Sequence, residues 1–258
     1  DWNKLQNGSD IRGVALEGIE GESVNLTTEV TTALAQAFVA WLGEKNGKTA
    51  QIIAVGSDSR LSSPTLRQAF ADGAAAAGAT VLNFGMASTP AMFMATVDEQ
   101  LHADGAVMVT ASHLPWNRNG LKFFTAKGGL EKADIACILE LAPQFMGSET
   151  EGNGEVKAVD FMATYCDILA NYIRRGVNNG DQPLQGMHII VDAGNGAGGF
   201  FANKVLKSLG ADTTGSQFLE PDGHFPNHIP NPENKEAMAS ICKAVVEHKA
   251  DLGIIFDT

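Results

Sequence analysis

Hydrophobic and polar positions follow two different periods along this chain. Short apolar runs such as "QIIAV", "GAVMV", "HIIV" and "LGII" are typical of strands buried on both faces of a sheet. Between these runs, apolar residues recur at the spacing of one helix face, as in "TTEVTTALAQAFVAWLGEKNG". The alternation predicts an α/β fold made of three-layer α/β/α domains with mostly parallel mixed sheets.

The same pattern places the expected elements. Helices are expected over 27–47, 62–79, about 89–97, 160–176 and 231–250. Strands are expected over 50–58, 80–85, 105–110, 212–220 and 251–258, and the stretch 187–211 has the pattern of strand, glycine turn and helix. Ser62 or Ser63 can cap the second helix, with Pro64 in its first turn.

A polar, glycine-rich stretch, residues 146–159, interrupts the alternation and is interpreted as a linker or a domain edge. It divides the chain into two expected α/β domains, residues 1–150 and 151–258, of which the second is a smaller β-α-β-α-β unit. The sequence stops at Thr258, at the carboxyl end of the last expected strand. Ligand sites in α/β sheets usually lie at that end of the strands.

The amino-acid composition limits the class of protein to which the chain can belong. With 44% hydrophobic and 19% charged residues, the 258-residue chain is typical of a globular protein. A net charge of −12 argues against nucleic acid or an anionic membrane as a partner, and no apolar run is long enough to cross a bilayer. Without a signal-like segment, we expect a cytoplasmic location, or an organelle after removal of a transit peptide.

Cysteine and histidine give no clear metal site. The chain has three cysteines, Cys137, Cys166 and Cys242. They form no C-x-x-C pair and lie in helix-like periodicity, so we expect buried thiols of a reducing compartment rather than a disulfide or a zinc site. His224 and His228 are four residues apart, but Pro226 lies between them and prevents a helix. We interpret "EPDGHFPNHIPNPE" as a rigid, shaped surface loop.

A glycine motif follows the expected strand near residue 190. Gly194, Gly196 and Gly199 of "DAGNGAGG" satisfy G-x-G-x-x-G in the context of a dinucleotide site, where Glu220 would bind the ribose. The same glycines also allow a strand and a helix to pack closely at a tight turn. We favour this second, structural interpretation.

Two short polar turns carry arginine. "VGSDSRLSS" places Asp58 and Arg60 just past a strand, either as an ion pair that pins the turn or as a substrate contact. In "GSDIRG", Arg12 lies in a glycine-flanked turn and can hold a phosphate through two parallel hydrogen bonds.

The stretch "VTASHLPWNRNGLKFF" carries the strongest signal. Ser112 follows the strand "GAVMV" and precedes Pro115, so the backbone amides of this turn can form an anion-binding nest. His113 has no acidic partner in the local sequence, a hydrogen bond to its neighbour Ser112 cannot be assumed, and the segment lacks the G-x-S-x-G elbow of hydrolases. A serine in such a turn can also be a simple cap.

"TASHLPWNRNGLK" resembles the phosphoserine loop of the α-D-phosphohexomutases, T-A-S-H-N-P followed by N-G-x-K. Other motifs agree in order: "DIRG" with the arginine loop, "GSDSR" with G-x-D-x-R, and "DAGNGAGG" and "PDGHFPNHIPNP" with loops of the second domain. "DLGIIFDT" is similar to the lead-in to the metal loop, D-x-D-x-D-R. The resemblance covers essentially the whole chain and indicates domains I and II of the family, with domains III and IV absent.

The resemblance implies a phosphosugar mutase that interconverts hexose 1-phosphate and hexose 6-phosphate. Ser112 would carry the phosphoryl group and exchange it through a hexose bisphosphate. Arg12 and Lys122 would bind the substrate and belong, with His113, to the catalytic group, Lys122 as general acid/base or charge stabiliser. A Mg²⁺ ion would bind the phosphate on Ser112 and three aspartates, of which Asp257 alone is present.

Two departures from the family pattern matter. Leu114 stands where the family usually has Asn, and the chain ends before the other metal ligands, so we expect the 258 residues alone to be inactive. "TASH" and the spacing to Lys122 favour mannose and glucose phosphates as substrates. The alternatives are a phosphoglucosamine mutase and a noncatalytic α/β protein that binds a sugar phosphate or a nucleotide; the oligomeric state is not specified by the sequence.

Overall fold

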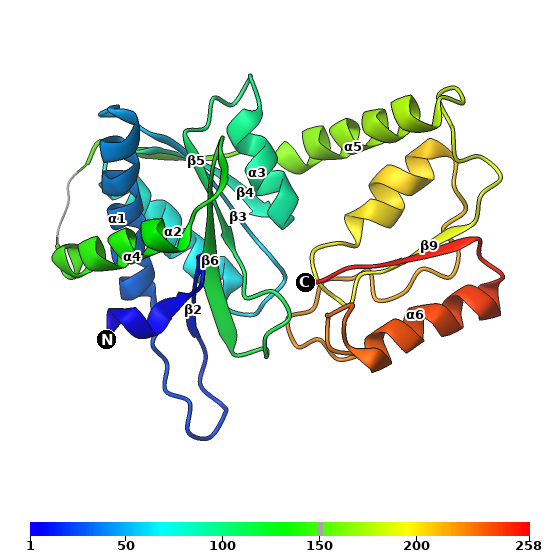
Figure 1. Cartoon of the computed structure of the whole chain (residues 1–258), viewed down its shortest axis with the longest axis horizontal. Helices are drawn as coiled ribbons and strands as arrows, with labels where there is room; N and C mark the ends of the chain where they lie inside the picture. The colour runs from blue at the N-terminus through cyan, green and yellow to red at the C-terminus, as the bar shows by residue number, and fades with distance from the viewer. Residues whose placement is uncertain (149–151) are drawn as a thin grey trace. The chain divides into compact units, whose positions relative to one another are not determined.

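The structure, a computed structural model, describes residues 1–148 and 152–258. The chain forms two compact units, Asp1–Asp160 and Phe161–Thr258 (Figure 1). Each unit has its own hydrophobic core. The domain boundary predicted between residues 150 and 151 lies outside the described residues.

Unit 1 is built on a mixed sheet. Its strands are β1 (Gln6–Asn7), β2 (Asp10–Val14), β3 (Ile52–Ser57), β4 (Thr80–Met86), β5 (Gly105–Val109), β6 (Arg118–Thr125), β7 (Gly128–Gly129) and β8 (Glu155–Ala158). They are ordered β1-β2-β6-β5-β3-β4-β8, and β7 pairs with β6. Strands β5, β3, β4 and β8 run parallel, whereas β6 runs antiparallel to both of its neighbours, β5 and β2. The predicted fold class, α/β with mostly parallel mixed sheets, is confirmed.

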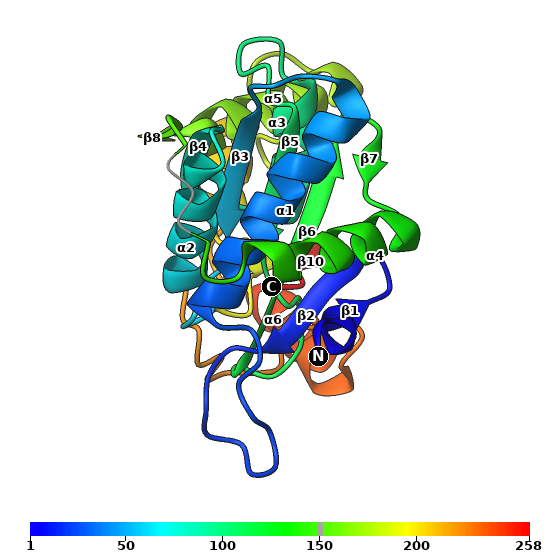
Figure 2. The same ribbon diagram turned by 90° about the vertical axis from the view of Figure 1, so that its left-hand side faces the viewer.

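Helices cover both faces of this sheet (Figures 1 and 2). Helices α1 (Thr28–Asn46), α2 (Ser63–Ala76) and α4 (Lys132–Leu141) lie on one face, and α3 (Thr89–Val97) lies on the other. Two 3-10 helices, η1 (Trp2–Leu5) and η2 (Ala142–Phe145), complete the unit. The ring of Phe123, fully buried in β6, packs 4.7 Å from the ring of Phe38 in α1. Because strand residues alternate between faces, Lys122 therefore points to the opposite face of the sheet.

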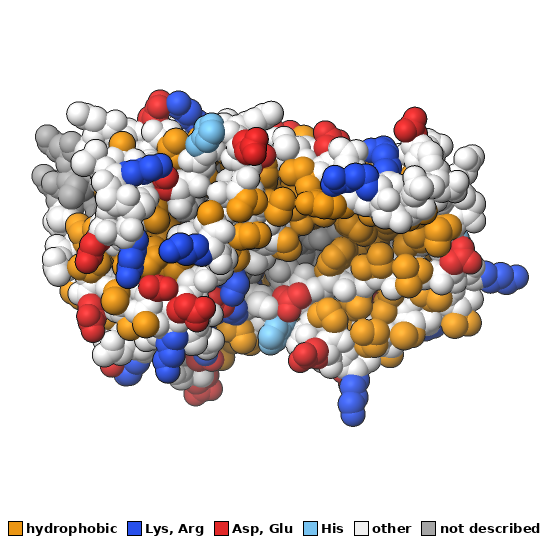
Figure 3. Space-filling view, turned by 45° about the horizontal axis from the view of Figure 1, so that its top comes forward, with side chains coloured by type: hydrophobic (Ala, Val, Ile, Leu, Met, Phe, Trp, Pro, Cys, Tyr) orange, Lys and Arg blue, Asp and Glu red, His pale blue; other side chains and the backbone are white. Residues whose placement is uncertain are grey.

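Unit 2 is built on two parallel strands, β9 (Ile189–Asp192) and β10 (Leu252–Ile255). Its helices are α5 (Phe161–Val177), a π-helix η3 (Phe201–Leu206), a 3-10 helix η4 (Lys207–Leu209) and α6 (Lys235–His248). Figure 3 shows hydrophobic side chains on the surface of this unit, at the right of the view. Its exposed large hydrophobic side chains are Tyr172, Val177, Met187, Ile229, Met238, Val246 and Leu252. None of the described helices is long and apolar enough to cross a membrane.

Three expected elements differ from the structure. The strand predicted over 212–220 is reduced to two isolated bridges, because Gly215 and Phe218 have φ values of 95° and 53° that interrupt an extended backbone. The helix predicted after the glycine turn is a π-helix followed by a 3-10 helix. The stretch interpreted as a linker contains β8, which pairs with β4 but is exposed at every position and so left no hydrophobic pattern.

The expectation of buried thiols is wrong for two of the three cysteines. Cys137 on α4 and Cys242 on α6 are exposed, and Cys166 on α5 is buried. Helical periodicity placed these residues on helices correctly, but it did not separate the covered face of α4 and α6 from the solvent face.

Candidate active site

The segment 110–117, here called the Ser112 loop, joins β5 to the antiparallel strand β6. Ser112 has a φ of 54°, a left-handed conformation that residues other than glycine rarely adopt. Its N–H donates to Oγ1 of Thr110 at 2.9 Å. Its Oγ lies 3.2 Å from Nδ1 of His113, so the two neighbouring side chains are in hydrogen-bond contact. Ser112 is partly exposed and His113 is exposed.

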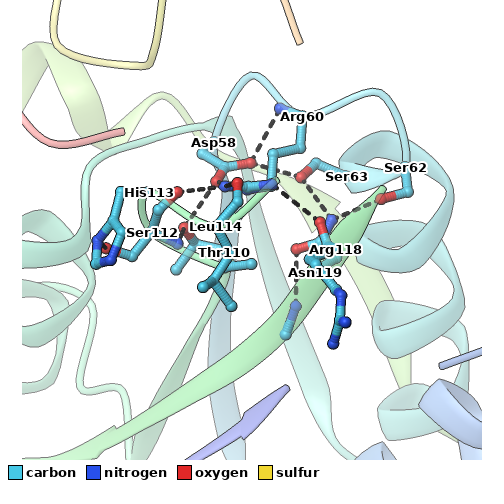
Figure 4. A network of polar contacts seen from close by, with 12 residues as sticks. Asp58, Arg60, Ser62, Ser63, Thr110, Ser112, His113, Leu114, Arg118 and Asn119 are labelled. Atoms are coloured by element: carbon cyan, nitrogen blue, oxygen red, sulfur yellow. Dashed lines mark hydrogen bonds and ion pairs between the residues drawn. The ribbon is translucent and has the colours of Figure 1, made fainter. Parts of the chain in front are cut away.

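Arg60 holds the Ser112 loop from inside the protein (Figure 4). Its Nη1 donates to the carbonyl oxygens of Pro115 and Arg118 at 2.8 and 3.0 Å. Its Nη2 donates to the carbonyl oxygen of Leu114 at 2.6 Å and to that of Ser112. The Arg60 side chain is 0% exposed. Of the two interpretations that the sequence left open for Arg60, the structure shows the structural one, since its donors bind backbone carbonyls.

Asp58 anchors Arg60 from the other side. Its Oδ2 lies 3.3 Å from Nε of Arg60 and accepts from Oγ1 of Thr110 at 2.7 Å. Its Oδ1 accepts from Oγ of Ser63 at 2.6 Å, and Asn119 donates to the same hydroxyl at 3.0 Å. Burial raises the pKa of the Asp58 carboxyl, and the Arg60 guanidinium and the two hydroxyl donors oppose that rise. The Asp58–Arg60 ion pair thus connects the end of β3, the start of α2 and both ends of the Ser112 loop.

A second polar cluster lies on β2 and β6. Ile11 pairs with Leu121 and Arg12 with Gly120, so Asp10, Arg12 and Lys122 share the face opposite to the buried Ile11 and Leu121. Oδ1 of Asp10 lies 2.9 Å from Nζ of Lys122, and Oδ2 lies 3.0 Å from Nη2 of Arg12. One carboxylate therefore bridges both cations.

Arg12 also reaches the Ser112 loop. Its Nη1 donates to the carbonyl oxygen of Ala111 at 2.5 Å. Gly120 leaves the space for this crossing, because a Cβ at that position would lie 3.0 Å from Cδ of Arg12 and 2.2 Å from the carbonyl oxygen of Ile11. Four of the predicted site residues, Arg12, Ser112, His113 and Lys122, are thus connected within unit 1 through the Ser112 loop and Asp10.

The glycine turn of unit 2 is explained by close packing. A Cβ on Gly199 would lie 2.2 Å from the carbonyl oxygen of Leu219, and Gly194 has a φ of 53°. Asn195 donates through Nδ2 to the carbonyl oxygen of Glu220 at 3.0 Å. These contacts account for the glycines of "GNGAGG" without a bound nucleotide.

The two histidines of the proline-rich loop contact different carboxylates. Nε2 of His228 lies 2.8 Å from Oδ2 of Asp192, and both side chains are buried. Nδ1 of His224 lies 2.7 Å from Oδ1 of Asp222, and both side chains are exposed. This arrangement supports the interpretation of the segment as a shaped loop.

The predicted metal ligand Asp257 follows β10 in unit 2 and is exposed. Across residues 1–148 and 152–258, no group of three or more His, Cys, Asp or Glu side chains could hold a metal ion. Mg²⁺ takes near-octahedral oxygen coordination and gives up its water ligands reluctantly, so a single carboxylate holds it weakly. The described protein residues therefore do not by themselves make a complete magnesium site.

Comparison with known proteins identifies the family. Residues 3–142 match the family profile described as "Phosphoglucomutase/phosphomannomutase, alpha/beta/alpha domain I". Residues 163–258 match the profile for domain II of the same family. The chain belongs to the phosphoglucomutase/phosphomannomutase family. The predicted resemblance to the α-D-phosphohexomutases is confirmed.

Relatives in the phosphoglucomutase/phosphomannomutase family extend beyond this chain. A phosphomannomutase of Escherichia coli is 36% identical over an alignment of 256 residues that covers 96% of this chain and 52% of that protein. A phosphoglucomutase of Neisseria gonorrhoeae is 33% identical over 242 residues, 94% of this chain and 49% of that protein. A crystal structure of a family protein from Burkholderia thailandensis has a TM-score of 0.76 at 27% identity and covers 97% of this chain and 51% of its own. The chain thus spans about half the length of the relatives it matches.

In this chain of the phosphoglucomutase/phosphomannomutase family, the sequence did not reveal Asp10 as a member of the site or the contact of Arg60 with the Ser112 loop. Asp10 lies inside the quoted motif "GSDIRG", but its role depends on the pairing of β2 with β6. Asp58 and Arg60 were noted as a pair, yet nothing in the local sequence connects them with a loop more than fifty residues later. An acid two residues before Arg12 was the available signal for Asp10, because side chains two apart on a strand share a face.

Proposed function

We propose that this protein is a phosphosugar mutase that interconverts hexose 1-phosphate and hexose 6-phosphate through a phosphoserine at Ser112. The observation that carries the proposal is the Ser112 loop, in which a partly exposed serine has a left-handed conformation. Arg12 donates to the carbonyl of the residue before this serine. Membership of the family and the names of the relatives support the same activity.

The proposed reaction is two phosphoryl transfers. In the first, the bond between phosphorus and Oγ of Ser112 breaks while a bond forms between phosphorus and a sugar hydroxyl oxygen. The sugar hydroxyl loses its proton, Oγ gains one, and the product is a hexose bisphosphate. In the second transfer, the other phosphoryl group moves from the bisphosphate back to Oγ. Nothing is oxidised or reduced, and catalysis depends on positioning and on neutralising charge.

His113, Arg12 and Lys122 have separate proposed roles. The imidazole of His113, in contact with Oγ of Ser112, exchanges the proton that Oγ gains and loses. Arg12 and Lys122 neutralise the charge of the transferring group. Asp10 fixes both cations on one face of the sheet, which favours charge stabilisation as the role of Lys122.

Mg²⁺ is the proposed cofactor, with the phosphate on Ser112 and Asp257 among its ligands. When bound, the ion would neutralise charge on the phosphoryl oxygens. Because Asp257 is one carboxylate and Mg²⁺ gives up its water ligands reluctantly, we propose that the 258 residues alone bind the ion weakly and are inactive.

Mannose and glucose phosphates are the proposed substrates. The names of the relatives, phosphomannomutase and phosphoglucomutase, favour these hexoses over glucosamine phosphate. The proposed partners are accordingly hexose phosphates and a hexose bisphosphate, and the cytoplasmic location stays a prediction.

The decisive experiment assays the full-length protein with mannose 1-phosphate, glucose 1-phosphate and glucosamine 1-phosphate. We expect turnover of the first two that requires a hexose bisphosphate as activator and that Ser112→Ala and Lys122→Ala abolish. Lys127→Ala is the matched control, because Lys127 is exposed near the other end of β6. Turnover of glucosamine 1-phosphate alone would identify a phosphoglucosamine mutase. Binding of hexose phosphates without turnover would identify a noncatalytic protein.

A further inference from the structure

We propose that Arg60 is a positioning residue for Ser112: it sets the conformation from which the serine transfers phosphate, without touching the substrate. The inference rests on the proposed function and adds a residue to it. Because the Arg60 side chain is 0% exposed, it acts through the backbone of the Ser112 loop.

The acceptors of the Arg60 guanidinium all lie in one short segment of chain around Ser112. Arg60 donates to the carbonyl oxygens of Ser112, Leu114, Pro115 and Arg118, four peptide groups within one turn of chain. A guanidinium offers its donors in a rigid planar fork. Four acceptors on one fork leave the loop little freedom to rotate about the peptides that flank Ser112.

Arg60 also sets the direction of the peptide dipoles in the Ser112 loop. In a trans peptide the N–H points opposite to the carbonyl oxygen, and the described chain contains no cis peptide bond. Since the carbonyls of Ser112 and Pro115 point at Arg60, the N–H groups of His113 and Trp116 point away from it. Arg60 thus turns carbonyl oxygens inward, away from the exposed side on which a phosphate would sit.

Arg60 is itself anchored by Asp58, which also contacts the Ser112 loop. Asp58 contacts the guanidinium and also accepts from Thr110, whose hydroxyl oxygen in turn accepts from the N–H of Ser112. Ser112 is therefore held by two routes that start from the same buried ion pair. Its left-handed φ persists because the surroundings impose it.

Arg60→Lys tests the proposal in the full-length protein. Lysine keeps the positive charge but has one nitrogen, which cannot reach all four carbonyls. We expect kcat to fall by about 100-fold, the order expected when a reacting group is misplaced by an ångström. KM for the hexose phosphate should stay near the wild-type value, because Arg60 does not contact the substrate.

Arg67→Lys is the matched control. Arg67 is half-buried on α2, and its Nη1 donates to Oγ of Ser57 instead of to the Ser112 loop. It should keep the wild-type kcat. Hydrogen exchange of the backbone amides of residues 111–114 and 116–118 should accelerate in Arg60→Lys and not in Arg67→Lys. An unchanged kcat with folded Arg60→Lys would overturn the proposal, as would a rise in KM with kcat unchanged.

A second pair of variants covers the case in which Arg60→Lys does not fold. Thr110→Val removes the hydroxyl between Asp58 and Ser112, whereas Thr110→Ser keeps it. We expect kcat to fall in the first and to recover in the second, and equal kcat values in the two would contradict the proposal. If the wild-type protein turns over no hexose phosphate, the proposed function fails. The exchange of the loop amides still tests whether Arg60 holds the loop.

Discussion

The ammonium group of Lys122 lies 2.9 Å from Oδ1 of Asp10, and the other oxygen of that carboxylate lies 3.0 Å from Arg12. The side chain of Asp10 is 11% exposed, so the contact is largely shielded from solvent. Two cations that lie far apart in the sequence are thus oriented by one acid, which is on the same strand as Arg12 and on the strand next to that of Lys122. Strand register places all three side chains on one face of the sheet, and the carboxylate of Asp10 holds the two cations close together there.

Asp10→Asn should lower kcat by about 10- to 100-fold, because asparagine keeps the shape of the side chain but cannot pair with two cations. Steady-state kinetics of the full-length protein with glucose 1-phosphate measure the effect. Asp72→Asn is the control, since Asp72 is exposed on α2 and accepts from Gln68. A wild-type kcat in Asp10→Asn would show that the bridge does not orient Arg12 and Lys122 for catalysis.

Ser112 should carry phosphate in protein purified from cells. Intact mass and phosphopeptide mapping should place one phosphoryl group on Ser112, and Ser112→Ala should remove it. Ser148→Ala, at an exposed serine outside the site, should leave the phosphate in place. Stoichiometric phosphate on another residue, with Ser112 unmodified, would contradict the assignment.

Gly120→Ala should destabilise unit 1 and impair the site together. The added Cβ would lie 2.2 Å from the carbonyl oxygen of Ile11, a contact that the backbone must move to relieve. We expect a loss of about 1–3 kcal/mol in the free energy of unfolding, as for overpacked cores. Gly129→Ala, whose nearest neighbours would be 3.9 Å away, should change little by comparison. Urea unfolding of the wild type, Gly120→Ala and Gly129→Ala measures their free energies of unfolding and so checks this order.

The pKa of Glu22 should report on the contact that holds the end of the Ser112 loop. Hydrogen bonds from Arg118 and then Asn117 lower the pKa of Glu22 below its ordinary value. Since the folded protein binds this proton less tightly than the unfolded chain, the contact stabilises the folded protein at pH values above the pKa of Glu22 in the unfolded chain. That stabilisation is lost as pH falls through the folded pKa.

Arg118→Gln should raise the pKa of Glu22 toward its ordinary value, which carbon-13 NMR of the carboxyl group can follow. The pKa of Asp222, lowered by His224 in unit 2, serves as the internal reference and should not change. If the pKa of Glu22 is the same in both proteins, the contact with Arg118 does not exist in solution.

Much of the fold could be predicted because the local periodicity of apolar residues specifies its strands and helices. The buried strands β3, β5 and β9 are short apolar runs, and α1 begins after Thr27 and ends before Gly47 as the sequence indicates. Strand β8 was missed because all four of its residues are exposed. The strand expected over 212–220 was wrong because turn conformations at Gly215 and Phe218 outweigh the local preference for extended chain.

The sequence by itself determined the α/β class, the family, and the residues Arg12, Ser112, His113 and Lys122 as candidates, because short motifs and apolar periods are local properties. Only the tertiary structure decided that Arg60 binds the carbonyls of the Ser112 loop and that Asp10 bridges two cations. The physical reason is that these contacts depend on strand register. The antiparallel return of β6 between β5 and β2 brings residues near 10, 60 and 120 together, and no local pattern encodes that pairing.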